Sequence, residues 1–320
     1  MEIITNVTQD VIKKAAKALR DGHLVAFPTE TVYGLGADAI NEKAVSLIYS
    51  VKGRPSDHPL IVHISSINQL DKWAVEIPEY AINLAKNYWP GPMTLILKRG
   101  EIANDFITGG QDNVGVRVPN QSVALALLSE FESLGGYGIA APSANRFGAV
   151  SPTNSEAVVE ELGNYLQESD LILDGGQCLV GVESTIIDCT KDHPVVLRPG
   201  AITAEMIKQT TGVKIYSESA KIKIKASGLL ESHYSPKAKV VIGTTTEPGN
   251  GFIAMANLPT PIGAIRLASP VNIEQYARDF YLALREGDRR ELKKITVIHP
   301  DGEGLAAAIR DRSNKAASGK

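Results

Sequence analysis

Residues 23–39 read HLVAFPTETVYGLGADA, an apolar run that Pro28 ends and that hydroxyl, carboxyl and aromatic side chains follow. The apolar run predicts a short buried strand, and polar groups at the end of such a strand are typical of the ligand-binding edge of an α/β sheet. GLGADA superficially matches a dinucleotide fingerprint. That fingerprint places its first glycine directly after a strand, whereas TETVY intervenes here, so the sequence does not predict an NAD site. We expect the rim of a small-molecule site; an ordinary capped turn is the alternative.

Helices and strands alternate on both sides of this segment. Apolar residues at helical spacing predict helices over 9–21, 41–51, 78–88, 121–134 and 154–162, the second of them with Asn41 as its N-cap. Apolar runs predict strands within 23–29, 59–65, 93–99, 114–119, 138–145, 171–176, 184–190 and 194–200. This alternation predicts an α/β or α+β fold with a mixed sheet.

A smaller unit follows residue 236. Strands are predicted within 239–244, 251–257, 261–268 and 295–300, and helices over 272–287 and 304–317. Residues 217–236, which precede this unit, are polar, alternating and rich in small side chains, as is typical of a linker. The predicted organisation is a catalytic domain over 1–216, a linker over 217–236 and a small α/β domain over 237–320.

Length and composition agree with two soluble domains. The chain has 320 residues, which is more than the about 100–200 residues of a typical domain. Apolar residues make up 43% and charged residues 22%, and no apolar run approaches the roughly 18 residues of a membrane helix. Cys178 and Cys189 show no C-x-x-C pairing and the N-terminus shows no signal pattern, so we expect a cytoplasmic protein with both thiols in its core.

Charge is distributed unevenly along the chain. Residues 1–217 carry 17 Lys and Arg against 25 Asp and Glu, a balance of −8, while residues 218–320 carry 16 against 11, a balance of +5. The two balances sum to the −3 of the whole chain. A general nucleic-acid binder is expected to be basic, so tight non-specific RNA binding is not predicted. The few cations of the acidic part are therefore informative.

Several basic residues of the acidic part are candidates for ligand contacts. Lys52 and Arg54 lie in KGRP after a helix, where Pro55 favours an extended chain, so the two can clamp a phosphate. A solvated basic helix end is the alternative. Arg117 lies mid-strand between apolar neighbours and needs a partner, which is either a ligand carboxylate or a protein carboxylate. His63 interrupts an apolar strand, where a hydrogen-bonded core histidine is the alternative to a ligand contact.

Further polar side chains stand where predicted strands end. Ser143 and Asn145 follow the strand GIA, Ser151 comes soon after them, and Arg198 ends the strand VVLR. The sequence has no P-loop, no H-E-x-x-H or Cys/His cluster and no G-x-S-x-G elbow, so we predict no metal-ligating residues and no nucleophile. Hydroxyl, amide, Arg and Lys groups can position and neutralise phosphates and carboxylates, which is most of what adenylyl transfer needs.

Eight segments occur in an order that resembles the threonylcarbamoyl-AMP synthases, the YrdC-like family. They are PTETVYGLGADA, KGRP, HPLIVHI, WPGPMTL, VGVRVP, APSANRFG, GVESTIID and LRPG, and the similarity covers residues 1 to about 210. SHYSPKA, YARDFYLALREGD and GLAAAIRDRSNKA are similar to the longer, two-domain members. The resemblance implies a twisted open mixed α/β sheet with a concave ligand-holding face, followed by a smaller Rossmann-like α/β domain.

The resemblance also implies the reaction. L-threonine, bicarbonate and ATP would give L-threonylcarbamoyl-AMP and pyrophosphate, which makes the chain a nucleotidyltransferase. Other proteins, the tRNA threonylcarbamoyl-transferases, would use the product to modify the adenosine beside the anticodon. ATP is a substrate in this reaction, Mg²⁺ is expected with it, and weak direct binding of tRNA is left open.

Roles of individual residues follow from the same resemblance. Lys52 and Arg54 would hold the ATP phosphates and act catalytically. The rest of the ATP site would be His58, Asn113, Ser143, Asn145, Ser151, Arg198 and Tyr234. L-threonine would contact Thr31, His63, Arg117, Ser184 and the backbone of Ala141. His233 and Tyr234 in the linker would fold over the nucleotide as a lid.

The chain departs from the family pattern at two places. His58 stands where members often carry Asn, and Ser227-Gly228-Leu229 stands where the linker usually has a Pro-Gly pair. Two other functions are alternatives. A carbamoyl-transfer domain that uses carbamoyl phosphate accompanies zinc-finger and acylphosphatase-like regions in similar proteins, and this sequence does not contain them. A non-catalytic RNA-binding module is disfavoured by the acidic balance of residues 1–217.

Overall fold

The computed structural model describes residues 1–213, 224–225, 228 and 233–319. Its larger part is built on a ten-stranded sheet with the order β1-β8-β2-β3-β7-β4-β6-β5-β9-β10. Parallel and antiparallel neighbours are mixed, since β4 runs parallel to β6 whereas β5 and β7 run antiparallel to their neighbours β6 and β4. The predicted mixed α/β sheet is confirmed.

The strands of the large sheet are short, and several come from the apolar runs of the sequence. They are β1 (Glu2–Ile4), β2 (Val25–Phe27), β3 (Gly34–Asp38), β4 (Ile61–His63), β5 (Met93–Lys98), β6 (Asn113–Arg117), β7 (Ile139–Ala140), β8 (Leu171–Leu173), β9 (Thr185–Asp188) and β10 (Val195–Arg198). The helices of this part are α1 (Gln9–Arg20), α2 (Glu42–Lys52), α3 (Leu70–Trp73), α4 (Glu79–Tyr88), α5 (Asp105–Thr108), α6 (Ser122–Ser133), α7 (Ser155–Leu162) and α8 (Ala204–Thr211), with a 3₁₀ turn over Ile67–Gln69.

Helices cover both faces of the large sheet. On one face, α1 and α6 pack together, and α1 buries Ile12, Ala15 and Leu19 at helical spacing against the sheet. A separate apolar cluster on the sheet includes residues of α2, α4 and α7. The predicted N-cap of α2 is confirmed, because the side chain of Asn41 accepts a hydrogen bond from the amide of Ala44 at 3.2 Å.

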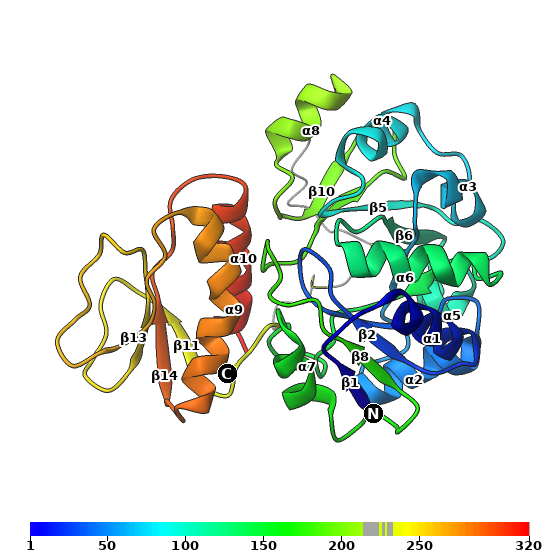
Figure 1. Cartoon of the computed structure of the whole chain (residues 1–320). Coiled ribbons are helices and arrows are strands. Elements are labelled where there is room, and N and C mark those ends of the chain that lie inside the picture. The colour runs from blue at the N-terminus through cyan, green and yellow to red at the C-terminus, as the bar shows by residue number, and fades with distance from the viewer. Residues whose placement is uncertain (214–223, 226–227, 229–232, 320) are drawn as a thin grey trace.

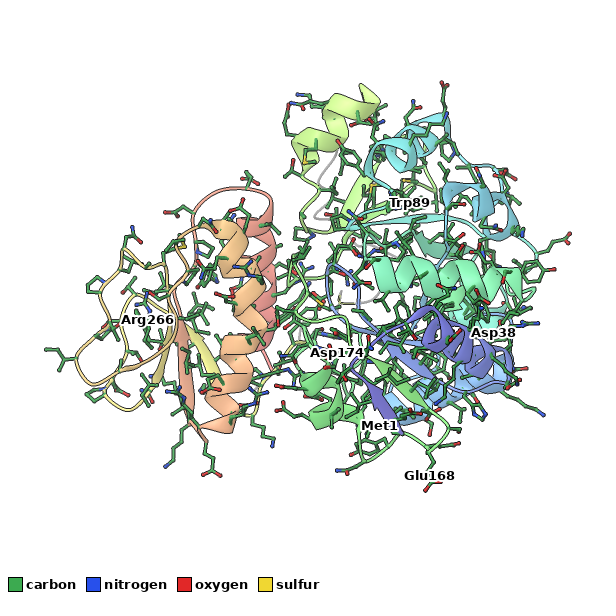
Figure 2. The ribbon with its side chains drawn as sticks, in the orientation of Figure 1. Met1, Asp38, Trp89, Glu168, Asp174 and Arg266 are labelled. Atoms are coloured by element: carbon green, nitrogen blue, oxygen red, sulfur yellow. The ribbon has the colours of Figure 1, made fainter. Side chains whose placement is uncertain are left out.

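A four-stranded parallel sheet with the order β11-β14-β12-β13 forms the smaller part. Its elements are β11 (Lys239–Ile242), β12 (Gly251–Ile253), β13 (Ile265–Ala268), α9 (Ile273–Arg289), β14 (Lys294–Val297) and α10 (Leu305–Ala317). In Figure 2, Arg266 lies in this part, and its guanidinium donates to the carbonyls of Ala254 and Met255 at 2.7 Å each, which fixes the chain just after β12. The predicted second α/β unit is confirmed.

Helices α9 and α10 lie between the small sheet and the larger part (Figure 1). Their buried side chains form one apolar cluster with Val32, Val150 and Val182 of the larger part. At Gly181, whose φ is +81°, an added Cβ would lie 2.3 Å from the Cα of Arg278 in α9, so only glycine fits this close approach. The two parts therefore share a packed junction.

Strand β3 was not predicted, because GLGAD lacks the β-branched residues that mark strands. Glycine is required in β3 because side chains of the neighbouring strands pack against it. A Cβ on Gly36 would lie 2.8 Å from the side chain of Phe27 in β2 and 2.8 Å from that of Ile139 in β7. The short elements β1, α3, α5 and α8 were not predicted either.

Most of the predicted linker, 217–236, lies outside the described residues, so the boundaries 1–216, 217–236 and 237–320 stay a prediction. Every helix that the structure describes is too short or too polar to cross a bilayer.

Candidate functional site

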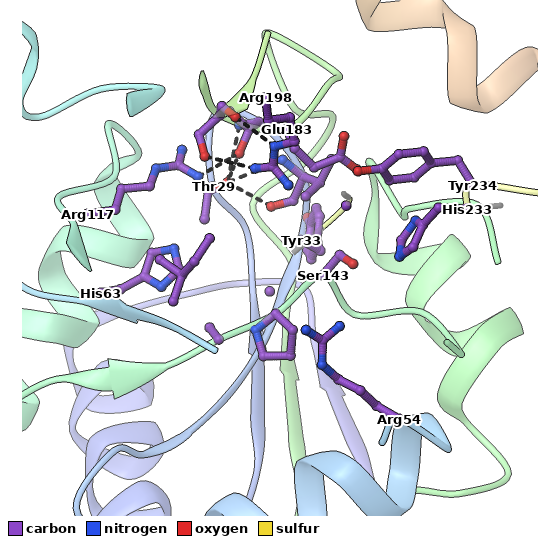
Figure 3. A pocket seen from close by; sticks show the side chains of 18 residues that line it. Thr29, Tyr33, Arg54, His63, Arg117, Ser143, Glu183, Arg198, His233 and Tyr234 are labelled. Carbon is purple, nitrogen blue, oxygen red and sulfur yellow. Dashed lines mark hydrogen bonds between the residues drawn. The ribbon is translucent and has the colours of Figure 1, made fainter. Parts of the chain in front are cut away.

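One pocket collects side chains from the ends of several strands and from the chain before β11 (Figure 3). It is lined by Thr29, Thr31, Val32, Tyr33, Gly34, Arg54, Ile61, His63, Arg117, Ala141, Pro142, Ser143, Glu183, Ser184, Arg198, Gly228, His233 and Tyr234. The polar segment after β2 therefore does form the rim of a pocket, as its composition predicted.

Arg117 lies at one end of the pocket, and each of its guanidinium nitrogens lies close to a protein oxygen. Its Nη2 lies 2.7 Å from Oε1 of Glu30, its Nη1 donates to Oγ1 of Thr31 at 3.0 Å, and its Nε donates to the carbonyl of Gly91 at 3.3 Å. Both charged side chains are only 5% exposed. The protein carboxylate that the sequence offered as one partner of Arg117 is therefore Glu30.

Thr31 and His63 flank Arg117. The hydroxyls of Thr29 and Thr31 lie 2.8 Å apart, which orients Thr31 toward the arginine. His63 ends β4 and pairs with Arg117 across the parallel ladder, so both side chains leave the sheet at the same edge. Burial, together with the charge of Arg117, lowers the pKa of His63 to about 3. The ring is therefore neutral near pH 7, and its Nδ1 accepts no hydrogen bond from the described residues.

Arg54 lies at the other end of the pocket. Its Nη2 donates to the carbonyl of Pro59 at 2.9 Å, and its guanidinium lies over the ring of Phe147, 5.7 Å from the centroid. Burial lowers the pKa of Arg54 to about 10, which leaves it charged at neutral pH. Phe147 also meets the rings of His58 and His233 edge-on, at centroid distances of 5.3 Å and 6.1 Å. This aromatic residue thus contacts two residues that the resemblance assigned to ATP, Arg54 and His58, and one that it assigned to the lid, His233.

Lys52 stands behind the pocket wall. Its side chain is buried, and its Nζ donates to the carbonyls of Ser143 and Asn145 at 2.6 Å and 2.5 Å. Burial, with the charge of Arg54 nearby, holds the pKa of Lys52 well below its ordinary value. In this arrangement Lys52 shapes the loop that carries Ser143, which lies on the pocket itself.

The remaining residues of that loop differ in their positions. Ser143 and Ala141 line the pocket, and the amide of Ala141 donates to the carbonyl of Ile61 at 3.0 Å. The Nδ2 of Asn145 donates to the carbonyls of Arg146 and Ala149, so Asn145 holds the loop closed from inside. Ser151 is fully buried and donates to a carboxylate rather than facing the cavity.

Glu183 and Arg198 form the upper wall of the pocket in Figure 3, and Ser184, which also lines the pocket, is bonded to Arg198. The guanidinium of Arg198 donates to the carbonyl of Ser184 at 3.0 Å and to its hydroxyl at 3.1 Å. Ser184 Oγ also lies 2.8 Å from the hydroxyl of Thr94. Burial raises the pKa of Glu183, but the charges of Arg312 and Arg198 outweigh that effect and hold it at about 2. The wall therefore carries an ionised carboxylate at neutral pH.

His233 and Tyr234 close the remaining side of the pocket. Their rings lie 4.2 Å apart, and Tyr234 adopts a φ of +62°, which is rare for a residue with a side chain. A Cβ on Gly228 would lie 2.1 Å from the hydroxyl oxygen of Tyr234, so the glycine leaves room for this ring. Burial lowers the pKa of His233 to about 3 and raises that of Tyr234. Both side chains are neutral at pH 7.

Two further predicted ATP residues, besides Lys52, Asn145 and Ser151, are not among the lining residues. Asn113 begins β6, whose opposite end carries Arg117, so roughly 13 Å of strand separates them. His58 meets Phe147 at the side of the pocket, and its carbonyl accepts from Arg54 and from Tyr49.

Sequence reasoning placed Glu30 on the rim of the site without its pairing to Arg117, and it assigned no role to three further groups that contact the site residues. Glu30 and Glu183 lie inside recognised segments, TETVY and GVEST, and a carboxylate among small and apolar residues was a usable signal. Tyr281 and Arg312 lie on α9 and α10, where no local feature of the sequence points to a pocket more than 90 residues away. Among the described residues, no three His, Cys, Asp or Glu side chains gather as a metal site.

Comparison with known proteins agrees with this architecture. Residues 17–200 match the family model described as "Telomere recombination", and residues 202–318 match the one described as "Threonylcarbamoyl-AMP synthase, C-terminal domain". The chain is 40% identical to the threonylcarbamoyl-AMP synthase of Pyrococcus abyssi, over 99% of this chain and 98% of that protein. It is 38% identical to that of Bacillus subtilis, over 100% of this chain and 96% of that protein.

Solved structures give the same result. The crystal structure of P. abyssi Sua5 complexed with L-threonine has a TM-score of 0.89 to this chain at 38% identity, covering 100% of this chain and 98% of that one. HypF of T. kodakarensis is 21% identical with a TM-score of 0.51, and the match covers only 24% of its chain, so that likeness concerns the fold alone. The resemblance seen in the sequence is confirmed, and the chain belongs to the threonylcarbamoyl-AMP synthase family.

Proposed function

We propose that this chain makes L-threonylcarbamoyl-AMP and pyrophosphate from L-threonine, bicarbonate and ATP, and so acts as a nucleotidyltransferase. Its product would serve the tRNA threonylcarbamoyl-transferases that modify tRNA. The proposal is carried by one observation: a single pocket has Arg117 with Thr31 at one end and Arg54 at the other. The first pair suits an amino-acid carboxylate, and the second end suits a polyphosphate.

In this proposal the end of the pocket with Arg117 takes L-threonine. The guanidinium of Arg117 would share its donors between Glu30 and the carboxylate of the substrate, while Thr31, His63, Ser184 and the backbone of Ala141 complete the contacts. Support comes from P. abyssi Sua5, a relative at 38% identity that has been solved with L-threonine.

ATP would occupy the other end. Arg54 and Arg198 lie on the lining and would face its phosphates, with Ser143 between them. Lys52 would act through the loop carbonyls that it holds, as would Asn145 from inside the same loop. His233 and Tyr234 would exclude water from the product, which hydrolyses easily. Direct contacts of His58, Asn113 and Ser151 with ATP remain predictions, since these residues are not among the lining side chains.

The reaction needs a neutral threonine amine, which attacks carbon dioxide to form a carbamate and release a proton, or attacks bicarbonate to form the same carbamate and release water. A carbamate oxygen then attacks the α-phosphorus, and pyrophosphate leaves. His63 and His233, the imidazoles on the lining, have pKa values of about 3 and are poor bases at neutral pH. The pocket would therefore act by positioning and charge stabilisation, and the amine proton would go to solvent or to bicarbonate.

Mg²⁺ would enter with ATP as part of the substrate. The carboxylate on the described lining, Glu183, already accepts hydrogen bonds from Ser151, Tyr281 and Arg312, so it does not fit a resident metal ligand. Mg²⁺ commonly binds through substrate phosphates and water. A cytoplasmic location and weak tRNA binding also stay predictions.

The test is to incubate the purified chain with MgATP, L-threonine and ¹³C-bicarbonate, quench quickly, and analyse the products by mass spectrometry. We expect labelled threonylcarbamoyl-AMP and an equal amount of pyrophosphate, both dependent on L-threonine. Arg54→Ala should lose the product, whereas Arg99→Ala, which removes an arginine outside the pocket that pairs with Asp105, should keep it.

Absence of labelled product from a folded protein that binds both ATP and L-threonine would overturn the proposal. A tRNA band shift that weakens with salt, without any ATP turnover, would favour the RNA-binding module instead. Product formed from carbamoyl phosphate but not from bicarbonate would favour the carbamoyl-transfer reaction.

A further inference from the structure

Glu183 is a buried carboxylate held mainly by the C-terminal helices. It is 6% exposed and belongs to the segment before β9. Ser151 donates to its Oε1 at 2.6 Å, Tyr281 of α9 lies 3.2 Å and 3.0 Å from its two oxygens, and Nε of Arg312 in α10 donates to Oε2 at 3.1 Å. Two of these three donors therefore cross the junction between the two parts of the chain.

Arg312 also ties together the two segments that flank the upper wall. Its side chain has no exposed surface, and besides Glu183 it donates to the carbonyl of Pro199 at 2.6 Å and to the backbone carbonyl of Glu183 at 3.2 Å. Pro199 directly follows Arg198 at the end of β10. The position of Arg198 on the pocket wall is thus coupled to α10.

The charges on this wall depend on one another. Glu183 is the anion, and Arg312 and Arg198 are the cations whose charges lower its pKa. A buried carboxylate without a cation is strongly unfavourable, so it draws any guanidinium within reach. Arg312 pairs with the charge of Glu183 and donates a hydrogen bond to its carboxylate. Arg198 therefore keeps its own contacts with Ser184 on the lining.

We propose that Arg312 is a positioning residue for ATP: by pairing with Glu183, it keeps the guanidinium of Arg198 directed toward the nucleotide. The inference rests on the proposed function, because it takes ATP as the ligand of this pocket. It gives the small C-terminal part a defined task in substrate binding, carried out through two side chains of the wall.

The test compares the affinities of the wild type, Arg312→Gln and the double variant Glu183→Gln/Arg312→Gln for ATP and for L-threonine, by calorimetry. Arg312→Gln should weaken ATP binding by about tenfold, within the range of coupling for one charge network, and change threonine binding by less than about twofold. The double variant should recover most of the ATP affinity, since no unpaired carboxylate remains. Arg310→Gln is the matched control: Arg310 lies on the same helix, and among the described residues its guanidinium donates to the carbonyls of Pro300 and Gly302, so this variant should match the wild type.

Unchanged ATP affinity in Arg312→Gln would overturn the inference. So would a double variant as weak as the single one, because loss of packing alone cannot be rescued by removing a charge. If Arg312→Gln does not fold, Tyr281→Phe keeps the ring and removes one donor to Glu183; it should weaken ATP binding a few-fold, and unchanged affinity would again overturn the inference. Calorimetry needs no turnover, so a wild type that binds ATP but forms no product would refute the proposed function without touching this result.

Discussion

The buried pair of Glu30 and Arg117 offers a test of the threonine site. Glu30→Gln keeps the shape of the side chain and the bond from the amide of Asn120, which now reaches Oε2 at 3.0 Å, but it removes the charge that lies 2.7 Å from Arg117. Removing one partner of a buried pair costs about 3–5 kcal/mol. We expect about 3 kcal/mol, because Thr31 and Gly91 continue to accept hydrogen bonds from Arg117.

L-threonine should restore part of this loss if its carboxylate binds Arg117. In the wild type the substrate carboxylate lies close to the charge of Glu30, whereas in Glu30→Gln it replaces that charge. A ligand at 100 times its Kd stabilises a protein by about 2.7 kcal/mol. In the variant the gain should exceed that of the wild type by about 1–2 kcal/mol at the same threonine concentration, which corresponds to roughly tenfold tighter binding.

The assay is urea unfolding of both proteins with and without L-threonine, with D-threonine as a ligand control. Glu76→Gln, which removes an exposed partner of Lys98, is the matched variant and should change the free energy of unfolding by less than about 1 kcal/mol. If Glu30→Gln is destabilised but gains no more from L-threonine than the wild type does, Arg117 is only a partner of Glu30. The carboxylate of the substrate must then bind elsewhere.

Three other changes probe the remaining side chains. Arg54→Ala should lower kcat by about 100-fold or more, because it removes charge stabilisation at the phosphates, while circular dichroism stays native; a near-normal kcat contradicts the role. Lys52→Met leaves the carbonyls of Ser143 and Asn145 without their donor, so urea unfolding should show a loss of about 2–6 kcal/mol and steady-state kinetics a raised KM for ATP. Burial lowers the pKa of His63 and of His233 to about 3 in the folded state, so the unfolded chain binds more protons below pH 6.5. Stability should be full above pH 6.5 and fall as pH drops toward 3, and kcat/KM should show no histidine step near pH 6.5; such a step would contradict the neutral rings.

Most elements of the fold could be predicted because their signals are local. Helix α1 repeats apolar residues every three or four positions, and α2 and α7 begin after Asn41 and Asn154, whose side chains cap them. Strand β3 could not be predicted in this way. Its residues form a strand because glycine fits between Phe27 and Ile139, and that requirement comes from packing across the sheet rather than from the segment itself.

In the candidate site too, residues with a local sequence signal could be predicted, whereas their partners from distant segments could not. Arg54 and Arg117 could be singled out because a charge after a helix or inside an apolar strand needs a partner. The identity of that partner depends on contacts between distant segments: Glu30 is 87 positions before Arg117, and Arg312 is 129 positions after Glu183. The motif resemblance supplied His233 and Tyr234, but only the folded chain places them against Phe147 and Gly228.

The acidic balance of residues 1–217 is compatible with a site for anionic substrates. The cations that the sequence assigned to the substrates have protein partners. Arg117 pairs with Glu30, Lys52 and Arg54 donate to backbone carbonyls, and Arg198 donates to Ser184. Glu30 thus holds the guanidinium of Arg117 in place and compensates its charge in the substrate-free pocket, while neutral oxygens hold the other cations. ATP and threonine would then bind by replacing some of these protein partners with their own phosphate and carboxylate oxygens. The affinity for each substrate therefore depends on how much more strongly the cations bind the substrate than their protein partners. A carboxylate that loses its own partner, as Glu183 would without Arg312, competes directly with the substrate.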